Sequence, residues 1–481
     1  MKIRQLLTAS GLYGIADMLL LGISGFLLLP LYTRTLSQTD FGAYVSIRAN
    51  TEILGYLLYF GLLSAVGRLY FDYPKGVARR SYLNSVVMFF IAAVVVAAIL
   101  FLFVGDALWQ LMSPTTPSQP YLWYALILAA TTFLAQLGSL WLRLEHRVNA
   151  FVSIQIFSAV LLTIAAYLAL VIFKLGLPGL LVVLVIGYLP AAAFLAYNIG
   201  DRLRPVIHRD EILPSLHYGM PYAISYIAYF LLNRFAVLNL QHQVGLDKVA
   251  IFGLAQQLAI MISIVSQSFG KAMQPAVFGA APDEAQHVLR RSSKLFILLI
   301  FGAASFAVMF AHEILRAVAP KAYLTGFPVL LVLLIASFIY SLNLVSNTTL
   351  EYFKRPRIQA TMSVLGAATS VVLGLLLIPH YDLMGGALAM LGAYVVVSAG
   401  GHIAAYRLSR QSYFGEIAMV VCAVCVLALI ALWPGWQAMS LPIAVLLKGM
   451  ITAIVVLALF SAYAPKQLAR FASSLRARRT T

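Results

Sequence analysis

The sequence predicts an all-α polytopic membrane protein with 14 transmembrane helices. Of the 481 residues, 62% are apolar and only 10% are charged, whereas about 25% of the residues in a soluble domain carry a charge. Fourteen apolar segments of about 20 residues or more follow one another along the chain, and each is long enough to cross a bilayer as a helix. A soluble globular protein is therefore excluded.

The first six segments are expected to form an N-terminal lobe over residues 1–200. Turn-forming residues such as Asp72-Tyr73-Pro74-Lys75-Gly76 separate the apolar runs. The segments lie at 6–33, 43–69, 82–104, 121–142, 149–173 and 177–198. The first is longer than the apolar core of a signal peptide, so we expect it to remain as a span.

A polar connector over residues 201–215 separates this lobe from the later spans. Six of these are expected to form a C-terminal lobe over 216–410, two are accessory spans within 411–465, and a basic tail follows over 466–481. The segments lie at 216–240, 249–273, 293–314, 324–350, 358–379, 384–406, 414–433 and 441–463. Tyr13-Gly14 and Tyr218-Gly219 open the first span of each lobe, which indicates a parallel repeat about the membrane normal.

The basic residues predict that both termini are cytoplasmic. With that orientation, most of the 33 Lys and Arg residues fall on the cytoplasmic side. The opposite side holds only Arg34, Lys174, Lys248, Arg316 and Lys321. Such a bias is typical of membrane proteins, so the net charge of +17 requires no nucleic-acid partner. We expect the chain to contact membrane lipids.

Metal and nucleotide chemistry are not expected. The two cysteines, Cys422 and Cys425, lie in an apolar run without a second cysteine pair or a histidine cluster. No G-x-x-x-x-G-K-[ST] motif for nucleotide binding occurs. The sequence therefore predicts no catalytic residues, no metal and no cofactor, apart from a coupled H⁺ or Na⁺.

Four ionisable residues lie within predicted spans, where charge is costly and is therefore a candidate for function. They are Asp17, Arg48, Glu52 and Arg234. The i,i+4 spacing of Arg48 and Glu52 places both side chains on one helix face. They either form a self-neutralising structural pair, or Arg48 binds a substrate phosphate while Glu52 competes for it and is released by protonation.

Asp17 is the second candidate for ion coupling, beside Glu52. It lies on a stripe with Ser10, Gly14 and Ser24, and desolvation among small residues favours the protonated form of an unpaired carboxyl group. Such a group suits proton coupling. The alternative is a structural ion pair with Arg48 or Arg234.

Two predicted spans carry polar faces suited to sugars and phosphates. Tyr222, Tyr226, Tyr229 and Asn233 recur at helical spacing next to Arg234, and Gln256 and Gln267 share a face of the following span. Tyrosine rings stack on sugars, amides bind hydroxyl groups, and an arginine fork suits a diphosphate. Ordinary helix packing and interhelical hydrogen bonds are the alternative interpretation. We set Lys448 and Glu313 aside, because both are expected to reach the hydrated interface near helix ends.

Three stretches of the chain carry recognisable motifs. They are Pro30-Leu31-Tyr32-Thr33-Arg34-Thr35-Leu36-Ser37-Gln38-Thr39-Asp40-Phe41-Gly42, the turn from Leu377 to Ala389, and Asn233-Arg234 followed by Val244-Gly245 and Phe252. These stretches resemble bacterial polysaccharide flippases of the Wzx type, whose superfamily also contains the MATE exporters. The chain departs from the family pattern at Asn233, where Asp is common, and at Asp382, where Gly is common.

The resemblance implies a MATE-like transporter with two six-helix lobes and a central cavity. It implies a flippase, monomeric and in a bacterial inner membrane, that moves a lipid-diphosphate-linked oligosaccharide outward by alternating access. The transport would serve O-antigen or exopolysaccharide synthesis, together with other assembly proteins. Two alternatives remain open at this stage. One is a MATE-type cation or drug antiporter, and the other is a membrane glycosyltransferase, ligase or polysaccharide polymerase.

Overall fold

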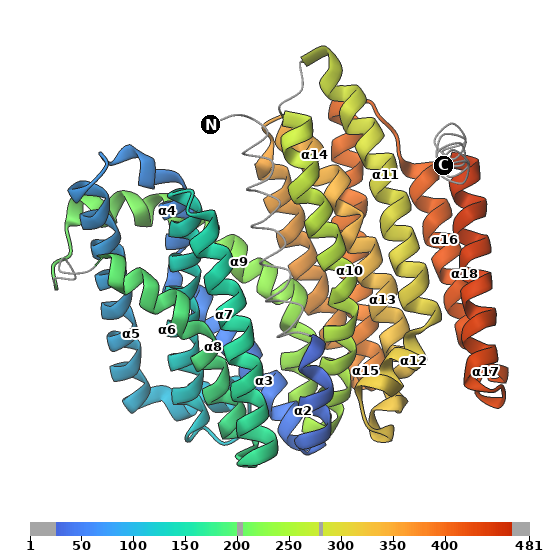
Figure 1. Ribbon diagram of the computed structural model, residues 1–481, viewed down its shortest axis with the longest axis horizontal. Helices are drawn as coiled ribbons and strands as arrows, with labels where there is room; N and C mark the ends of the chain where they lie inside the picture. The colour runs from blue at the N-terminus through green and yellow to red at the C-terminus, as the bar shows by residue number, and fades with distance from the viewer. Residues whose placement is uncertain (1–25, 200–204, 279–281, 464–481) are drawn as a thin grey trace, which may run out of the picture.

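The described residues form two helical bundles that lie side by side (Figure 1). The computed structural model describes residues 26–199, 205–278 and 282–463. The first bundle contains α2 (Leu29–Thr35), α3 (Gln38–Tyr59), α4 (Leu62–Leu69), η2 (Tyr70–Asp72), α5 (Val77–Met112), α6 (Tyr121–Leu144), α7 (Val148–Tyr167), η3 (Leu168–Ile172) and α8 (Gly176–Ile199). Within these ranges no strand is present.

The second bundle follows along the chain. It contains α9 (Arg209–Gln243), α10 (Leu246–Phe278), α11 (Pro282–Met309), α12 (Ala311–Val318), η5 (Lys321–Gly326), α13 (Phe327–Ser341), α14 (Asn343–Tyr352), α15 (Pro356–Ser409), α16 (Phe414–Ala431), α17 (Gly435–Ala438) and α18 (Leu441–Tyr463). Helix α9 begins at Arg209, so residues 209–215 of the predicted connector are helical.

Eleven helices of the described part are long and apolar enough to span a membrane, or up to 12 if a bent pair counts as one span. The predicted number of 14 differs from this for two visible reasons. Most of segment 6–33 lies outside the described residues, and α15 alone covers two predicted spans. At about 1.5 Å per residue, its 54 residues would measure roughly 80 Å, far more than one crossing requires.

Helix α15 is broken at Asp382, whose backbone has φ 56° and ψ −131°. This conformation favours glycine, yet the chain has aspartate there. Position 385, in the same turn, has room only for glycine, because a Cβ atom there would lie 2.3 Å from the backbone oxygen of Leu377. The predicted turn between the spans 358–379 and 384–406 therefore exists within a single helical segment.

A second break divides the predicted span 43–69 into α3 and α4, which are bent by 49°. Phe60 and Gly61 both have left-handed φ angles, of 48° and 70°. A Cβ atom on Gly61 would lie 2.0 Å from the backbone oxygen of Gly219 in α9. The bend thus brings the backbone of the turn between α3 and α4 into direct contact with that of α9.

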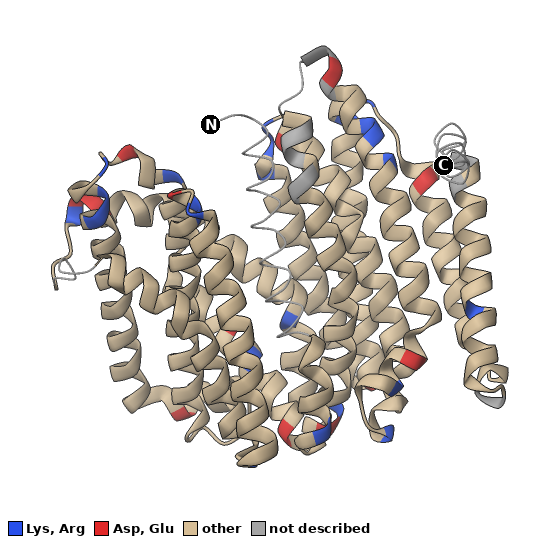
Figure 2. Ribbon diagram, viewed as in Figure 1, with Lys and Arg blue, Asp and Glu red and all other residues tan. Residues whose placement is uncertain are grey.

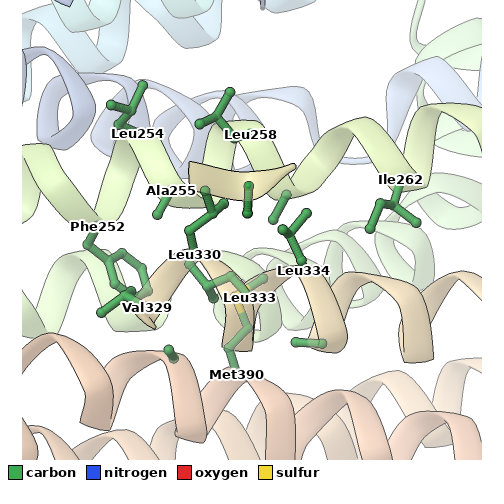
Figure 3. Close-up of a cluster of buried hydrophobic side chains, with 14 of the residues drawn as sticks. Phe252, Leu254, Ala255, Leu258, Ile262, Val329, Leu330, Leu333, Leu334 and Met390 are labelled. Atoms are coloured by element: carbon green, nitrogen blue, oxygen red, sulfur yellow. The ribbon is translucent and has the colours of Figure 1, made fainter. Parts of the chain in front are cut away.

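The core of the second bundle is formed by α10, α13 and α15 (Figure 3). Phe252 and Ala255 of α10 lie on the side of Leu330 of α13, and Met390 of α15 closes the cluster; each is at most 3% exposed. In the most apolar window of α5, by contrast, only 17% of the residues are buried inside the protein. Helices such as α5 therefore face the surroundings, while α10 and α13 form the interior.

Charged residues lie mostly at the two ends of the bundles, and the middle is nearly free of them (Figure 2). The expectation that Lys448 and Glu313 reach the hydrated interface is wrong. Lys448 Nζ of α18 lies 2.7 Å from Glu313 Oε1 of α12, and its side chain is only 1% exposed. The two residues form a largely buried ion pair that ties α18 to α12, since α11 packs against both helices.

Candidate functional site

An ion pair joins the two bundles near the middle of their helices. Arg234 Nε of α9 lies 2.9 Å from Glu52 Oε2 of α3, and the two side chains are 24% and 27% exposed. Arg234 lies nine residues before the end of α9 and Arg48 ten residues after the start of α3. Both distances correspond to about 15 Å along a helix, or half the thickness of a bilayer core.

Helix α10 fixes the orientation of the Arg234 guanidinium. Its Nη1 donates to Gln256 Oε1 at 3.0 Å, and Gln256 Nε2 donates to the backbone oxygen of Asn233 at 2.7 Å. Gln256 is 2% exposed, so this amide has little freedom to exchange its partners for water. From α15, the hydroxyl group of Tyr394 donates to Asn233 Oδ1 at 2.5 Å. The predicted residues Asn233, Arg234 and Gln256 are therefore parts of one hydrogen-bond network.

Arg48 lies beside this network. It donates a hydrogen bond to the Tyr188 hydroxyl group and is close enough to Tyr44 and Glu52 for electrostatic interaction. Arg48 and Arg234 are also close enough for their charges to repel each other. The sequence spacing allowed Glu52 to pair with Arg48, whereas the ion pair observed is with Arg234. Among the described residues, Arg48 and Arg234 lie near a single carboxylate, that of Glu52, so these three groups together carry a net positive charge.

Tyrosine rings line the same region. Tyr226 stacks on Tyr56 with ring centroids 5.5 Å apart, and the Tyr56 hydroxyl group donates to Glu52 Oε1 at 3.2 Å. Tyr229 lies within electrostatic reach of Glu52 and Arg234 and is 40% exposed. Aromatic faces and a cationic group are therefore accessible side by side.

Two predicted residues of the described part are not in this cluster, and a third cannot be placed. Gln267 is exposed and follows Gln256 by 11 residues, a separation of roughly 16 Å along a helix. Tyr222 is 42% exposed and stacks on Tyr218. Asp17 lies outside the described residues.

Three residues of the cluster were missed by sequence reasoning. Tyr56 lies four residues after Glu52, so an extension of the stripe Arg48, Glu52 along the helix would have found it. Tyr188 and Tyr394 carry no such local signal, because α8 and α15 approach α3 and α9 only in the folded protein. Within the described ranges, no three His, Cys, Asp or Glu side chains are placed to hold a metal ion.

Solved structures share this fold. The structure "Lipid II flippase MurJ, inward closed conformation" matches with a TM-score of 0.77 at 12% identity, over 95% of this chain and 99% of that chain. An outward-facing multidrug resistance MATE family transporter of the MOP superfamily matches with a TM-score of 0.57 at 15% identity, over 85% and 99%. An inward-facing one matches with 0.56 at 16% identity, over 86% and 97%. At these identities, the likeness establishes the fold.

The sequence establishes the family. The model of the family described as polysaccharide biosynthesis protein matches residues 11–279, more than half of the chain, and the chain belongs to this family. No curated protein sequence is significantly similar to it. The chain is therefore a multi-pass membrane protein of the polysaccharide biosynthesis family, with the fold of the solved MurJ and MATE structures. This confirms the resemblance read from the sequence.

Proposed function

We propose that the protein is a flippase for a lipid-diphosphate-linked oligosaccharide in a bacterial inner membrane. The substrate would move from the cytoplasmic to the periplasmic leaflet, for O-antigen or exopolysaccharide synthesis. The observation that carries this proposal is the cluster of Arg48, Arg234 and Glu52 at the boundary between the bundles, since a net positive, partly exposed site suits a diphosphate.

The side chains around the two arginines would bind the sugars of the substrate. Tyr226 and Tyr229 offer aromatic faces to the first sugars, while Asn233 and Gln256 hold Arg234 and take part in binding. Tyr222 and Gln267 are exposed at a greater distance, where they suit the outer sugars of a long substrate. The isoprenoid chain remains in the lipid, because burying it in a polar site would cost its hydrophobic stabilisation.

Glu52 provides a means of ion coupling. Its carboxylate competes with a diphosphate for Arg234, because both are anions that accept from the same guanidinium. Protonation of Glu52 would release Arg234 for substrate. A directional cycle requires such a second species, since a ligand shifts two states only by its differential affinity for them. Asp17 is retained as the alternative coupling site for H⁺ or Na⁺.

We further propose 14 spans with both termini in the cytoplasm, in lobes 1–200 and 216–410 with accessory spans in 411–465. The break of α15 at Asp382 supports two crossings in place of one. Basic residues at the ends of the helices support the orientation. A monomer in contact with lipid and with other assembly proteins follows from the resemblance.

Transport in proteoliposomes tests the proposal. A fluorescent polyprenyl-diphosphate oligosaccharide is placed in one leaflet, and its transfer is measured for the wild type and for Arg48→Ala, Arg234→Ala and Arg234→Lys. We expect each change to lower the rate at least about tenfold, the equivalent of one charge-assisted hydrogen bond. Arg68→Ala is the matched control, because Arg68 forms an exposed pair with Asp72 at 3.1 Å. Unchanged rates in both Arg48 and Arg234 variants would refute the phosphate site.

A MATE-type cation antiporter is the second candidate, because solved MATE structures share the fold. Its cavity would have to attract organic cations, and the two guanidinium groups beside the single carboxylate of Glu52 disfavour this. Uptake of ethidium into the same proteoliposomes, lost in Glu52→Gln, would favour the antiporter over the flippase.

A further inference from the structure

Helix α9 carries a row of four tyrosines between its expected cytoplasmic end and Arg234. Tyr218, Tyr222, Tyr226 and Tyr229 follow one another at intervals of four, four and three residues, which places them on one face of the helix. Arg234 comes 16 residues after Tyr218, a separation of roughly 24 Å along a helix. The row is therefore longer than one sugar and comparable in length to a chain of several sugars.

The tyrosine row lies on the side of α9 that faces the second bundle's interior helices. Tyr229 is 40% exposed and is close enough to Tyr340 of α13 and Tyr394 of α15 for electrostatic interaction. The other exposed side of this part of α9 is apolar. It includes Ile224, which is 65% exposed and lies roughly 200° around the helix from Tyr222. The apolar side suits contact with lipid, so the tyrosine side is the one that a polar substrate between the bundles would meet.

Three of the four tyrosines belong to stacked pairs. Tyr218 and Tyr222 stack with ring centroids 5.5 Å apart, and their hydroxyl oxygens are 3.4 Å apart. Tyr226 stacks on Tyr56, and its hydroxyl group shares a hydrogen bond with that of Ser64 in α4 at 2.6 Å. Because each ring is held by its neighbour, little side-chain freedom is lost when a ligand binds. An aromatic face next to hydroxyl groups suits the C–H face and the hydroxyl groups of a sugar ring.

We propose that the Tyr218–Tyr222 pair binds an outer sugar of the substrate, and that the protein thereby selects chains of several sugars over a single sugar. This rests on the proposed function, in which the site around Arg234 holds the diphosphate. The first sugar then contacts Tyr229, and a longer chain continues along α9 to Tyr222, 12 residues and roughly 18 Å from Arg234. A substrate with one sugar ends before the pair and gains no binding energy from it.

Anchoring at the membrane interface is the competing role for such a pair, because tyrosines are enriched there. The two roles differ in how they depend on the substrate. A pair that anchors the helix affects the transport of every substrate equally. A pair that binds an outer sugar affects only a substrate that is long enough to reach it. The ratio of the transport rates of a long and a short substrate therefore separates the two roles.

Transport of two substrates in proteoliposomes tests the proposal. Both carry the same polyprenyl diphosphate, one with a single sugar and the other with a linear pentasaccharide, and both are used at low surface density so that the rate reflects binding. We expect the wild type to move the pentasaccharide substrate faster. Tyr218→Ala and Tyr222→Ala should each lower the ratio of the pentasaccharide rate to the single-sugar rate by about fivefold, the equivalent of one aromatic contact.

Two further variants serve as controls. Tyr222→Phe keeps the aromatic ring, so it should retain most of the wild-type ratio. Tyr197→Ala removes a tyrosine of α8 that is 83% exposed and lies outside the row, so it should leave the ratio at the wild-type value. Each ratio compares two substrates in the same preparation, and a variant that folds less completely lowers both rates together.

Two results would overturn the proposal. One is a wild-type ratio that persists in both alanine variants, which would leave interface anchoring as the role of the pair. The other is a wild type that moves the single-sugar substrate as fast as the pentasaccharide substrate. Failure of the proposed function would look different, because Arg48→Ala and Arg234→Ala would then leave the rates of both substrates unchanged.

Discussion

At the scale of single residues, the choice of ion-pair partner for Glu52 determines the candidate site. The i,i+4 spacing of Arg48 and Glu52 could not exclude a pair within one helix, because the two side chains lie on the same face. In the folded protein, Glu52 binds Arg234 of α9 instead. The carboxylate thereby joins the two bundles, and its state of charge bears on how they are held together.

Glu52→Gln tests this role. The change leaves Arg234 bonded to Gln256 but removes its anionic partner. Because both side chains are about one quarter exposed, we expect a loss of only about 1–2 kcal/mol in the free energy of unfolding. Substrate binding should strengthen and the response of transport to a proton gradient should vanish. Thermal unfolding and flux with an imposed gradient measure the two effects, and a gradient response that persists in Glu52→Gln would exclude Glu52 as the coupling group.

At the scale of elements, the break of α15 has both a strained backbone and an ion pair. Asp382 occupies a backbone conformation that favours glycine, and its carboxylate pairs with Lys248 at the start of α10. Backbone strain of this kind costs about 1–3 kcal/mol, whereas a half-exposed ion pair contributes about 1 kcal/mol or less. The aspartate therefore binds α10 to the turn at a conformational cost.

Two substitutions at Asp382 separate the contributions. Asp382→Gly loses the ion pair and relieves the strain, so stability should stay equal or rise by about 1 kcal/mol. Asp382→Ala loses the ion pair but keeps a Cβ atom, so it should be less stable than Asp382→Gly by about 1 kcal/mol or more. Thermal unfolding of the two variants in the same detergent provides the comparison. An alanine variant as stable as the glycine variant would show that the turn is not strained.

The last helix is attached by a buried charge. Lys448 of α18 is paired with Glu313 of α12 and lies over the Trp436 ring, 5.3 Å from its centroid. Lys448→Met leaves Glu313 without a partner in a largely buried place, and we expect a loss of about 3 kcal/mol. The double variant Lys448→Met with Glu313→Gln should recover most of this loss, because no uncompensated charge remains. The free energy of unfolding is measured for the wild type, the two single variants and the double variant. If the losses of the two single variants simply add in the double variant, Lys448 and Glu313 do not stabilise the protein as a pair.

At the scale of the whole molecule, the bundles are joined at the end that carries α2. Thr39 Oγ1 donates to Asp247 Oδ1 at 2.7 Å, and Arg34 Nη2 donates to the backbone oxygen of Ala317 at 2.8 Å. A Cβ atom on Gly42 would lie 2.0 Å from the backbone oxygen of Leu246. Alternating access requires these contacts, at the expected periplasmic end, to separate during each cycle.

A reversible cross-link tests that requirement. In a background with Cys422→Ser and Cys425→Ser, we introduce Thr39→Cys and Asp247→Cys and form the disulfide with a mild oxidant. Transport should stop and return on reduction, because the bundles can no longer separate at this end. The control is Arg68→Cys with Asp72→Cys. These positions are four residues apart within the first bundle, where the native Arg68 Nη1 and Asp72 Oδ1 lie 3.1 Å apart, and this variant should remain active. Undiminished transport by the cross-linked Thr39 and Asp247 pair would exclude opening at this point.

The sequence by itself determined the membrane class, the approximate positions of the spans, the family and the residues that place charge inside the bilayer. Apolar length, basic loops and short motifs are local properties, so they can be read without coordinates. Only the tertiary structure decided that Glu52 binds Arg234, that Tyr188 and Tyr394 complete the cluster, and that Lys448 is buried against Glu313. These contacts join helices far apart in the chain, and helical periodicity gives the face of a residue but not the helix that packs against it.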